Sequence, residues 1–227
     1  MAFWTLSCAA TLIAIAMIAV LPTMPADRAL SLGSLVAAFR NPGVRVGFAI
    51  TALIVTAHFA AYTYVRPGLE FFAGLNASQV GTMLLIYGAF GVVGNFIAGP
   101  SAAKSPKAVV VSLSVGIAVT LALFPISATT LIAAALLMAA WGLFYGGASV
   151  STQTWIAQAV PVHREAASAL WVAVFNASIA LGAFAGGRIH DHSGSETVFW
   201  TAAGIATLAM LLATFRSPVV AKRELTT

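Results

Sequence analysis

His58 is the residue of this sequence best suited to do chemistry, because it lies inside a long apolar stretch. An imidazole exchanges a proton near neutral pH and can donate or accept hydrogen bonds. Thr51 and Tyr62 stand seven residues before and four residues after it, which places all three near one helix face. The pattern predicts either a histidine that contacts a solute or carries a proton, or a neutral imidazole bonded to the hydroxyl of Thr56 or Tyr62.

A second stripe of aromatic and polar side chains lies further along the chain. Trp141, Tyr145 and Ser149 recur at steps of four residues, so they share a face of one helix. Tyr87, on a different apolar stretch, is a candidate for the same aromatic wall. Aromatic surfaces with a few polar groups are typical of small-molecule sites, and ordinary packing is the alternative.

Asn176 is the last candidate, because an amide inside an apolar stretch must find a hydrogen-bonding partner in another helix or a bound solute. The predicted solute-binding set is therefore Thr51, His58, Tyr62, Tyr87, Trp141, Tyr145, Ser149 and Asn176. The chain contains no H-E-x-x-H, G-x-S-x-G or P-loop motif, so we predict no catalytic residues and no cofactor. The adjacent residues His190, Asp191 and His192 predict a solvated loop and no metal site.

Seven apolar runs must position these side chains, each long enough to cross a bilayer, which takes about 20 residues. They cover residues 3–21, 46–66, 79–99, 108–126, 129–152, 167–187 and 197–215. The chain is 60% hydrophobic and only 7% charged, whereas a soluble domain carries about 25% charged residues. We predict an all-α, polytopic membrane helix bundle with seven transmembrane helices and the lipid bilayer as its surroundings.

The basic residues lie mostly in alternate loops between these runs. One side holds Arg28, Arg40, Arg45, Lys104, Lys107, Arg164, Arg216, Lys222 and Arg223. The other side holds only Arg66 and Arg188. Lys and Arg accumulate on the cytoplasmic side of membrane proteins, so we predict an outside N-terminus and a cytoplasmic C-terminus. The net charge of +5 then reflects this bias, and no nucleic-acid partner is predicted.

From the second run onward the character of the runs repeats as polar, small-residue-rich and bland. Successive runs alternate in direction, so the pattern predicts two inverted three-helix repeats, an arrangement that occurs in secondary transporters. Small residues let helices approach closely in lipid. The glycines predicted to pack are Gly88, Gly91, Gly142, Gly146, Gly182 and Gly186. The bland runs 108–126 and 197–215 are expected to face lipid, and Trp155 and Trp200 to lie at the membrane interface.

Three segments resemble a known family. The chain reads GNFIAGPSAAKSPK from Gly94, FNASIALGAFAGGRIHDHSG from Phe175 and HFAAYTYVRPGLE from His58. The first resembles the G-N-x-x-G-G-x-L-A-D-R-x-P-R pattern of the major facilitator superfamily. The others resemble the eleventh and seventh helices of its drug:proton antiporter branch, of arabinose-efflux and purine-ribonucleoside-efflux type.

The first of these segments is the predicted cytoplasmic gate loop. Its candidate residues are Gly94, Asn95, Gly99, Lys104 and Lys107. The two lysines, which stand where the family pattern has Arg, could bond the carbonyls at helix C-termini, which carry partial negative charge. Ala103 stands where the pattern has Asp, and this argues against a charge-relay gate. The alternative is a plain cytoplasmic anchor.

The resemblance implies twelve helices in two six-helix halves around a central cavity. Residues 1–21 would then be the last helix of a missing N-terminal half with five further helices, and 22–45 the cytoplasmic connecting loop. Residues 46–216 would be the C-terminal six-helix transporter domain, and 217–227 a cytoplasmic tail. The implied function is proton-coupled export of drugs, sugars or nucleosides through a bacterial inner membrane by alternating access.

Protons are thus an implied partner beside a small-molecule substrate. No Asp or Glu lies near the middle of an apolar run, so the proton carrier is either His58 or an acid in the missing half, and we favour the latter. Two other classes stay open at this point. One is a non-transporting membrane fragment or helix-packing partner, and the other is a seven-helix receptor, although the last run lacks a lysine that could hold retinal.

Overall fold

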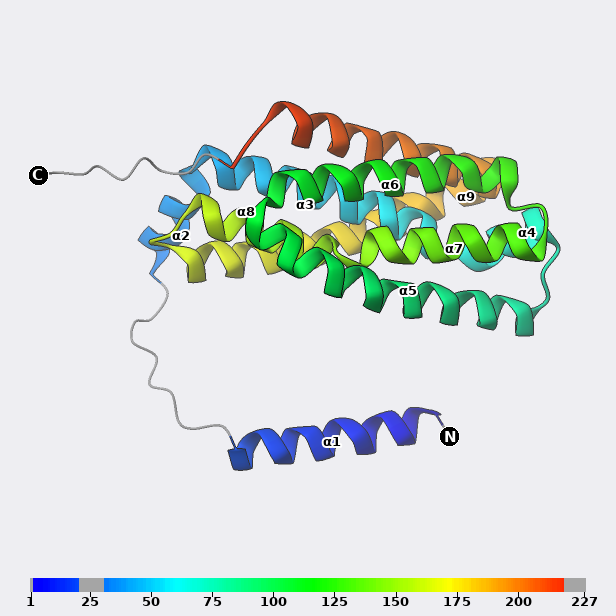
Figure 1. The fold of residues 1–227 in the computed structure, drawn as a ribbon, viewed down its shortest axis with the longest axis horizontal. Coiled ribbons are helices and arrows are strands. Elements are labelled where there is room, and N and C mark those ends of the chain that lie inside the picture. Colours follow the sequence, from blue (N-terminus) through cyan, green and yellow to red (C-terminus); the bar gives the residue numbers. More distant parts are fainter. Residues whose placement is uncertain (1, 21–30, 219–227) are drawn as a thin grey trace, which may run out of the picture. The chain divides into compact units, whose positions relative to one another are not determined.

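The protein is described by a computed structural model that covers residues 2–20 and 31–218, in which every regular element is a helix. In chain order the helices are α1 (Ala2–Val20), α2 (Leu32–Arg40), α3 (Pro42–Tyr62), α4 (Val65–Ala73), α5 (Ala77–Lys104), α6 (Pro106–Ser127), α7 (Leu131–Gly146), α8 (Ala148–Ala159) and α9 (Arg164–Phe215). The chain divides into two units, residues 1–30 and 31–227 (Figure 1).

The first unit contains α1, an apolar helix of 19 residues without a charged side chain. At about 1.5 Å per residue its length is close to the thickness of a hydrocarbon core. This helix confirms the helical character of the first apolar run. Residues 22–30 of the predicted connecting loop, which was expected to cover 22–45, and residues 219–227 of the predicted tail lie outside the described residues.

The second unit begins with α2, and the dipeptide Asn41-Pro42 ends α2 and starts α3. The side-chain oxygen of Asn41 accepts hydrogen bonds from the backbone N–H groups of Gly43 and Val44 at 2.8 and 3.2 Å. Pro42 occupies the first turn of α3, where a missing N–H costs nothing. The helix therefore starts at Pro42 rather than at residue 46, because Asn-Pro is a helix-start signal that apolar content does not register.

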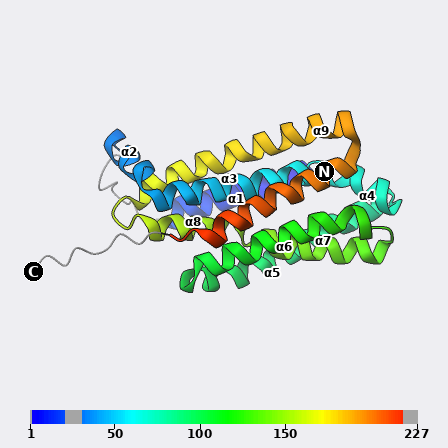
Figure 2. The same cartoon turned by 90° about the horizontal axis from the view of Figure 1, so that it is seen from above.

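Helices α3 to α9 form one bundle in which α3 packs mainly against α9, α5 against α7, and α6 against both α7 and α9 (Figure 2). The α3–α9 pairing joins the polar helix of the first predicted triple to the small-residue-rich helix of the second. The α7–α5 pairing joins the polar helix of the second triple to the small-residue-rich helix of the first. The two pairings are therefore reciprocal, as the two predicted inverted repeats would give.

The long helix α9 consists of two helical segments on either side of Gly194, whose backbone is non-helical with φ 79° and ψ 174°. Glycine lacks a Cβ and adopts this positive φ readily. Figure 2 shows the chain reversing direction there. The last two predicted runs, 167–187 and 197–215, occupy the two segments. His190, Asp191 and His192, predicted in a loop, are helical, because Gly194 makes the reversal in little space.

Five helices among the described residues are long and apolar enough to span a membrane: Pro42–Tyr62, Ala77–Lys104, Pro106–Ser127, Leu131–Ala159 and Arg164–Phe215. The helical membrane bundle is confirmed, whereas this count, which takes α9 as one helix, does not establish the predicted seven spans.

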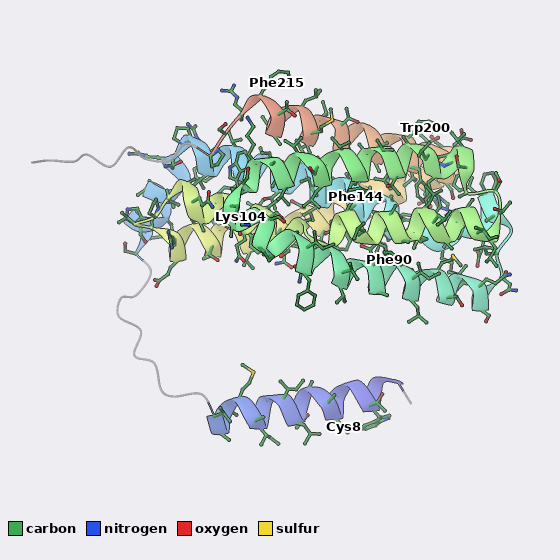
Figure 3. All side chains as sticks on the ribbon, in the orientation of Figure 1. Cys8, Phe90, Lys104, Phe144, Trp200 and Phe215 are labelled. Atoms are coloured by element: carbon green, nitrogen blue, oxygen red, sulfur yellow. The ribbon has the colours of Figure 1, made fainter. Side chains whose placement is uncertain are left out.

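The distribution of burial differs from the expectation for the bland helices. Half of the most apolar window of α6 is buried, compared with only 17% of that of α5. The reason is position, because α6 lies against both α7 and α9 whereas α5 packs mainly on α7. The side chain of Phe90 on α5 projects away from the helices that α5 packs against (Figure 3). Bland composition therefore does not place a helix at the periphery of this bundle.

Candidate functional site

His58 lies at the centre of a group of aromatic rings contributed by α3, α5 and α7. The Tyr145 ring stacks on the imidazole with centroids 3.3 Å apart and planes 8° apart. Tyr62 and Tyr87 are also nearly parallel to it, at 5.0 and 6.0 Å. Trp141 meets its edge at 5.5 Å. These five residues are called the aromatic cluster below, and all five belong to the predicted solute-binding set.

The hydrogen-bond partner of His58 lies on a different helix from the two predicted partners. Its Nε2 atom lies 3.4 Å from the hydroxyl of Tyr87 on α5. The predicted partners were Thr56 and Tyr62 on its own helix. The Thr56 hydroxyl donates instead to the Ser178 carbonyl on α9, and Tyr62 contacts the imidazole through its ring. The histidine thus bridges α3 and α5, and its side chain is only 2% exposed.

Glycines set the level at which α5 and α7 meet, and hence the position of the Tyr87, Trp141 and Tyr145 rings. A Cβ at Gly142 would collide with the Tyr87 carbonyl, and one at Gly146 with the Gly91 carbonyl. The backbones of α5 and α7 therefore touch beside the cluster. By contrast, a Cβ at Gly88 would meet no atom within 4 Å, so the structure does not bring this predicted packing glycine to a contact.

The same device positions α9 against α3. A Cβ at Gly182 would collide with the Thr56 carbonyl, and one at Gly186 with the Ala60 carbonyl. These contacts flank His58 on both sides along α3. Close backbone approach through small residues is the usual way in which membrane helices associate. The predicted packing role thus coincides with close helix contacts at Gly142, Gly146, Gly182 and Gly186.

Trp141 is held from behind by two further aromatic residues. The Phe124 ring on α6 and the Phe199 ring on α9 stack on each other with centroids 4.5 Å apart. They contact the indole at 6.0 and 6.1 Å. Trp141 is fully buried as a result. This apolar backing leaves the indole little rotational freedom, so its N–H keeps a defined position next to the other rings.

Three of the buried polar atoms in the cluster have no hydrogen-bond partner. Among the described residues such atoms are His58 Nδ1, Trp141 Nε1, Tyr145 Oη and Ser151 Oγ. Buried polar atoms in proteins are nearly always hydrogen-bonded. The concentration of three exceptions within a single group of contacting side chains is therefore informative about what the cluster binds.

Thr51, Ser149 and Asn176 of the predicted set form no hydrogen bond with the aromatic cluster. The Thr51 hydroxyl is buried and donates to the Gly47 carbonyl of its own helix. Ser149 is exposed and lies on α8, beyond the break that ends α7. Asn176 is also exposed, and its amide donates to the Val172 carbonyl one turn earlier. Only the ring-bearing members of the set come together.

The comparison with known families decides the class of the protein. The family model described as Major Facilitator Superfamily matches residues 6–226. The chain belongs to the Major Facilitator Superfamily. It is therefore an integral membrane protein. The members of this superfamily are transporters and not enzymes. The alternative of a seven-helix receptor is wrong.

At the end of the bundle that contains α2, three hydrogen bonds join α8 to neighbouring elements of this superfamily protein. The Trp155 indole donates to the Gly43 carbonyl, the Asn41 amide donates to the Ala159 carbonyl, and the Gln158 amide donates to the Ala103 carbonyl. These bonds, between 3.2 and 3.3 Å long, connect α8 to the start of α3 and the end of α5.

Trp155 is thus buried within the bundle and is not an interfacial residue as predicted. The apolar run continues as α8 to Ala159, so Trp155 lies inside a helix rather than at the end of a span. Trp200 agrees better with the prediction, because it is 42% exposed and close to the turn at Gly194 (Figure 3). The burial of Trp155 could have been recognised only from the helix contacts.

Of the predicted gate residues, Lys104 and Lys107 lie at this same end, but neither bonds a helix C-terminus among the described residues. Lys104 is exposed at the end of α5, and Lys107 donates to the Ser217 hydroxyl at 3.2 Å. The Ala103 carbonyl at the α5 C-terminus is bonded by the uncharged Gln158 instead. Gly94 packs directly against the α7 backbone at Leu143. Asn95 is exposed on α5 and Gly99 is partly exposed.

The bond from Asn41 to the Ala159 carbonyl can be tested by Asn41→Asp. The carboxylate still caps α3, but it cannot donate to Ala159 and leaves that carbonyl unpaired. We expect this substitution to lower the free energy of unfolding by about 1 kcal/mol. Thermal unfolding of the two proteins in the same detergent measures the effect.

Asn76→Asp is the matched control, because Asn76 caps α5 with the same side chain and has no bond to another helix among the described residues. A carboxylate near a helix N-terminus is mildly favourable. We therefore expect Asn76→Asp to leave stability unchanged or slightly raised. Equal losses for both substitutions would show that the bond to Ala159 contributes nothing.

Proposed function

We propose that the protein is part of a proton-coupled transporter that exports small organic solutes by alternating access, with the aromatic cluster as this chain's share of the solute site. The observation that carries the proposal is the burial of His58 among rings from three membrane-spanning helices, with three polar atoms of the cluster left unpaired. Aromatic surfaces with a few directed polar groups are what small-molecule sites usually present.

A further set of helices, five beyond α1, belongs to the proposed transporter and packs on α5 and on the first segment of α9. Asn95 on α5 and Asn176 on the first segment of α9 have exposed amides. Asn176 donates one bond to the Val172 carbonyl, and its remaining amide groups, like those of Asn95, have no partner among the described residues. Hydrocarbon cannot satisfy these groups, so such side chains face protein or water in a membrane. This supports a protein-lined or water-filled space, not lipid, beside these two residues. A central cavity between two helical halves meets that requirement.

We assign proton binding to an acid on those further helices. In the described part of the chain the acidic residues are Glu70, Glu165, Asp191 and Glu196. The first belongs to α4, the second opens α9, and the other two flank Gly194, so none takes part in the contacts of the cluster. His58 then serves as a solute contact. The alternative is that His58 itself carries the proton.

Vesicles provide the test of transport. The protein is expressed from its native reading frame, so that any segment encoded beside residues 1–227 is present, and inside-out membrane vesicles are supplied with radiolabelled arabinose, radiolabelled inosine or fluorescent ethidium. We expect proton-driven uptake of at least one tracer, abolished by an uncoupler. No uptake of any tracer above vesicles without the protein would contradict the proposed export function.

The same assay on residues 1–227 alone tests the need for further helices. A cavity formed between two halves cannot be opened and closed by one half, so we expect no proton-driven flux from the 227-residue chain in reconstituted vesicles. Flux from this chain by itself would show that the proposed additional helices are not required.

A further inference from the structure

We infer that the aromatic cluster binds a flat, uncharged solute that carries hydrogen-bond acceptor atoms. This inference rests on the proposed function, because it takes the cluster to be the solute site. Three independent properties of the cluster specify the chemistry of its ligand: the orientation of the rings, the kind of polar atoms left unpaired, and the charges around them.

The rings favour a flat solute because several of them are nearly parallel. The planes of Tyr145, Tyr87 and Tyr62 lie within 8°, 19° and 21° of the imidazole of His58. Parallel rings present flat faces to whatever lies between them, and aromatic groups gain from offset stacking at such faces. A planar solute can therefore replace one stacking contact by two. A bulky, non-planar solute gains no comparable surface.

The unpaired atoms require acceptors on the solute. An indole N–H is a donor only, so Trp141 Nε1 can be satisfied only by an acceptor atom. The Tyr145 hydroxyl and His58 Nδ1 can adapt as donor or acceptor. A solute with an acceptor facing the indole satisfies an atom that the protein leaves unpaired. A hydrocarbon of the same shape leaves the N–H without a partner and loses that contribution.

The charges around the cluster disfavour an ionic solute. Among the described residues, the rings of the cluster contact no carboxylate and no Lys or Arg side chain. Glu70, the acid on the nearby α4, forms an ion pair with Arg66. Ring faces attract cations, but a buried ion without a counter-ion carries a large desolvation cost. A neutral solute avoids that cost.

The ring contacts also indicate how the solute enters. His58 is 2% exposed and Tyr145 covers one face of its ring, so the cluster is closed on itself in this arrangement. Trp141 is fixed by Phe124 and Phe199 behind it. A solute is therefore expected to part Tyr145 from His58 while the indole stays in place and supplies the N–H.

Three probes of nearly equal size and shape separate the possibilities: quinoxaline, which is neutral with two ring acceptors, naphthalene, which has none, and N-methylquinolinium, which is cationic. Binding to the purified chain in lipid nanodiscs is measured by saturation-transfer difference NMR, with empty nanodiscs subtracted. We expect quinoxaline to bind more tightly than either of the other two. Trp141→Phe keeps an aromatic ring and removes the N–H donor together with part of the indole surface, and naphthalene binding measures the effect of the lost surface.

We expect Trp141→Phe to weaken quinoxaline binding by about fivefold to tenfold more than naphthalene binding, because only quinoxaline uses the N–H donor. Retained naphthalene binding also shows that the site is still folded. Trp200→Phe is the matched control, because the Trp200 indole is 42% exposed, contacts Glu196 and takes no part in the cluster. This control should leave the binding of all three probes unchanged.

Tighter binding of N-methylquinolinium would overturn the inference in favour of a cation site. Unchanged quinoxaline binding after Trp141→Phe would overturn the role of the indole N–H. In both cases the proposed transport function would still stand if the vesicles accumulate a tracer. Absence of binding by all three probes, together with absence of tracer flux, would instead remove the solute site itself.

Discussion

Replacing Gly146 by alanine is expected to lower the free energy of unfolding by about 1–3 kcal/mol, the usual cost of overpacking a tight contact. The added Cβ would collide with the backbone carbonyl of Gly91, and a backbone cannot move aside as a flexible side chain can. Helices α5 and α7 must then separate. Since Tyr87, Trp141 and Tyr145 lie on these helices, solute binding should weaken with stability.

Gly88→Ala is the matched control, because a Cβ there meets no atom within 4 Å. Alanine is favoured over glycine in a helix by about 0.5–1 kcal/mol, so this substitution should be neutral or stabilising. Thermal unfolding of both variants in the same detergent gives the comparison. If Gly146→Ala were as stable as Gly88→Ala, the close contact of α5 and α7 would not exist in the folded protein.

His58→Gln is expected to weaken solute binding by about tenfold while leaving the pH dependence of transport unchanged. Glutamine can still bond the Tyr87 hydroxyl, but it has no ring to stack on Tyr145 or Tyr62. A ring pair contributes about 0.5–1.5 kcal/mol beyond burial, which sets the size of the loss. The pH dependence should persist, because we place proton binding on other helices.

The measurements are the affinity of the purified variant for quinoxaline and the pH profile of tracer uptake by vesicles. These vesicles contain the variant expressed from its native reading frame. His192→Gln is the control, since this exposed histidine bonds the Arg188 carbonyl of its own helix and lies outside the cluster. It should change neither quantity. A flattened pH profile for His58→Gln alone would identify His58 as the proton carrier and contradict our assignment.

Part of the aromatic cluster could be predicted from helical spacing, and part of the prediction failed for identifiable reasons. His58 and Tyr62 are one turn apart and their rings stack. Trp141 and Tyr145 are also one turn apart, and both contact His58. Thr51 shares their face but lies seven residues, or about 10 Å, along the axis from His58. A common face is therefore not a common level.

The prediction that Ser149 lies beside Tyr145 on one face fails for a different reason. The stripe of four-residue steps assumes a continuous helix, whereas α7 ends at Gly146 and α8 begins at Ala148. The helix is interrupted at Gly147, so the stripe of four-residue steps does not continue through it. Trp155 was predicted at the interface because the apolar run was taken to end at residue 152. In the structure α8 extends to Ala159 and buries the indole against α3.

The sequence by itself determined the helical membrane class, because apolar runs of this length have no other stable state in lipid, where every backbone group must bond within its own helix. It also indicated four of the glycines at close helix contacts, Gly142, Gly146, Gly182 and Gly186, and the buried imidazole of His58. Only the tertiary structure decided that Tyr87 is the partner of His58, that α8 joins the α2 end, and that α6 is more buried than α5. These features depend on the level and rotation at which helices distant in the sequence meet, and helical periodicity specifies a face without specifying its neighbour.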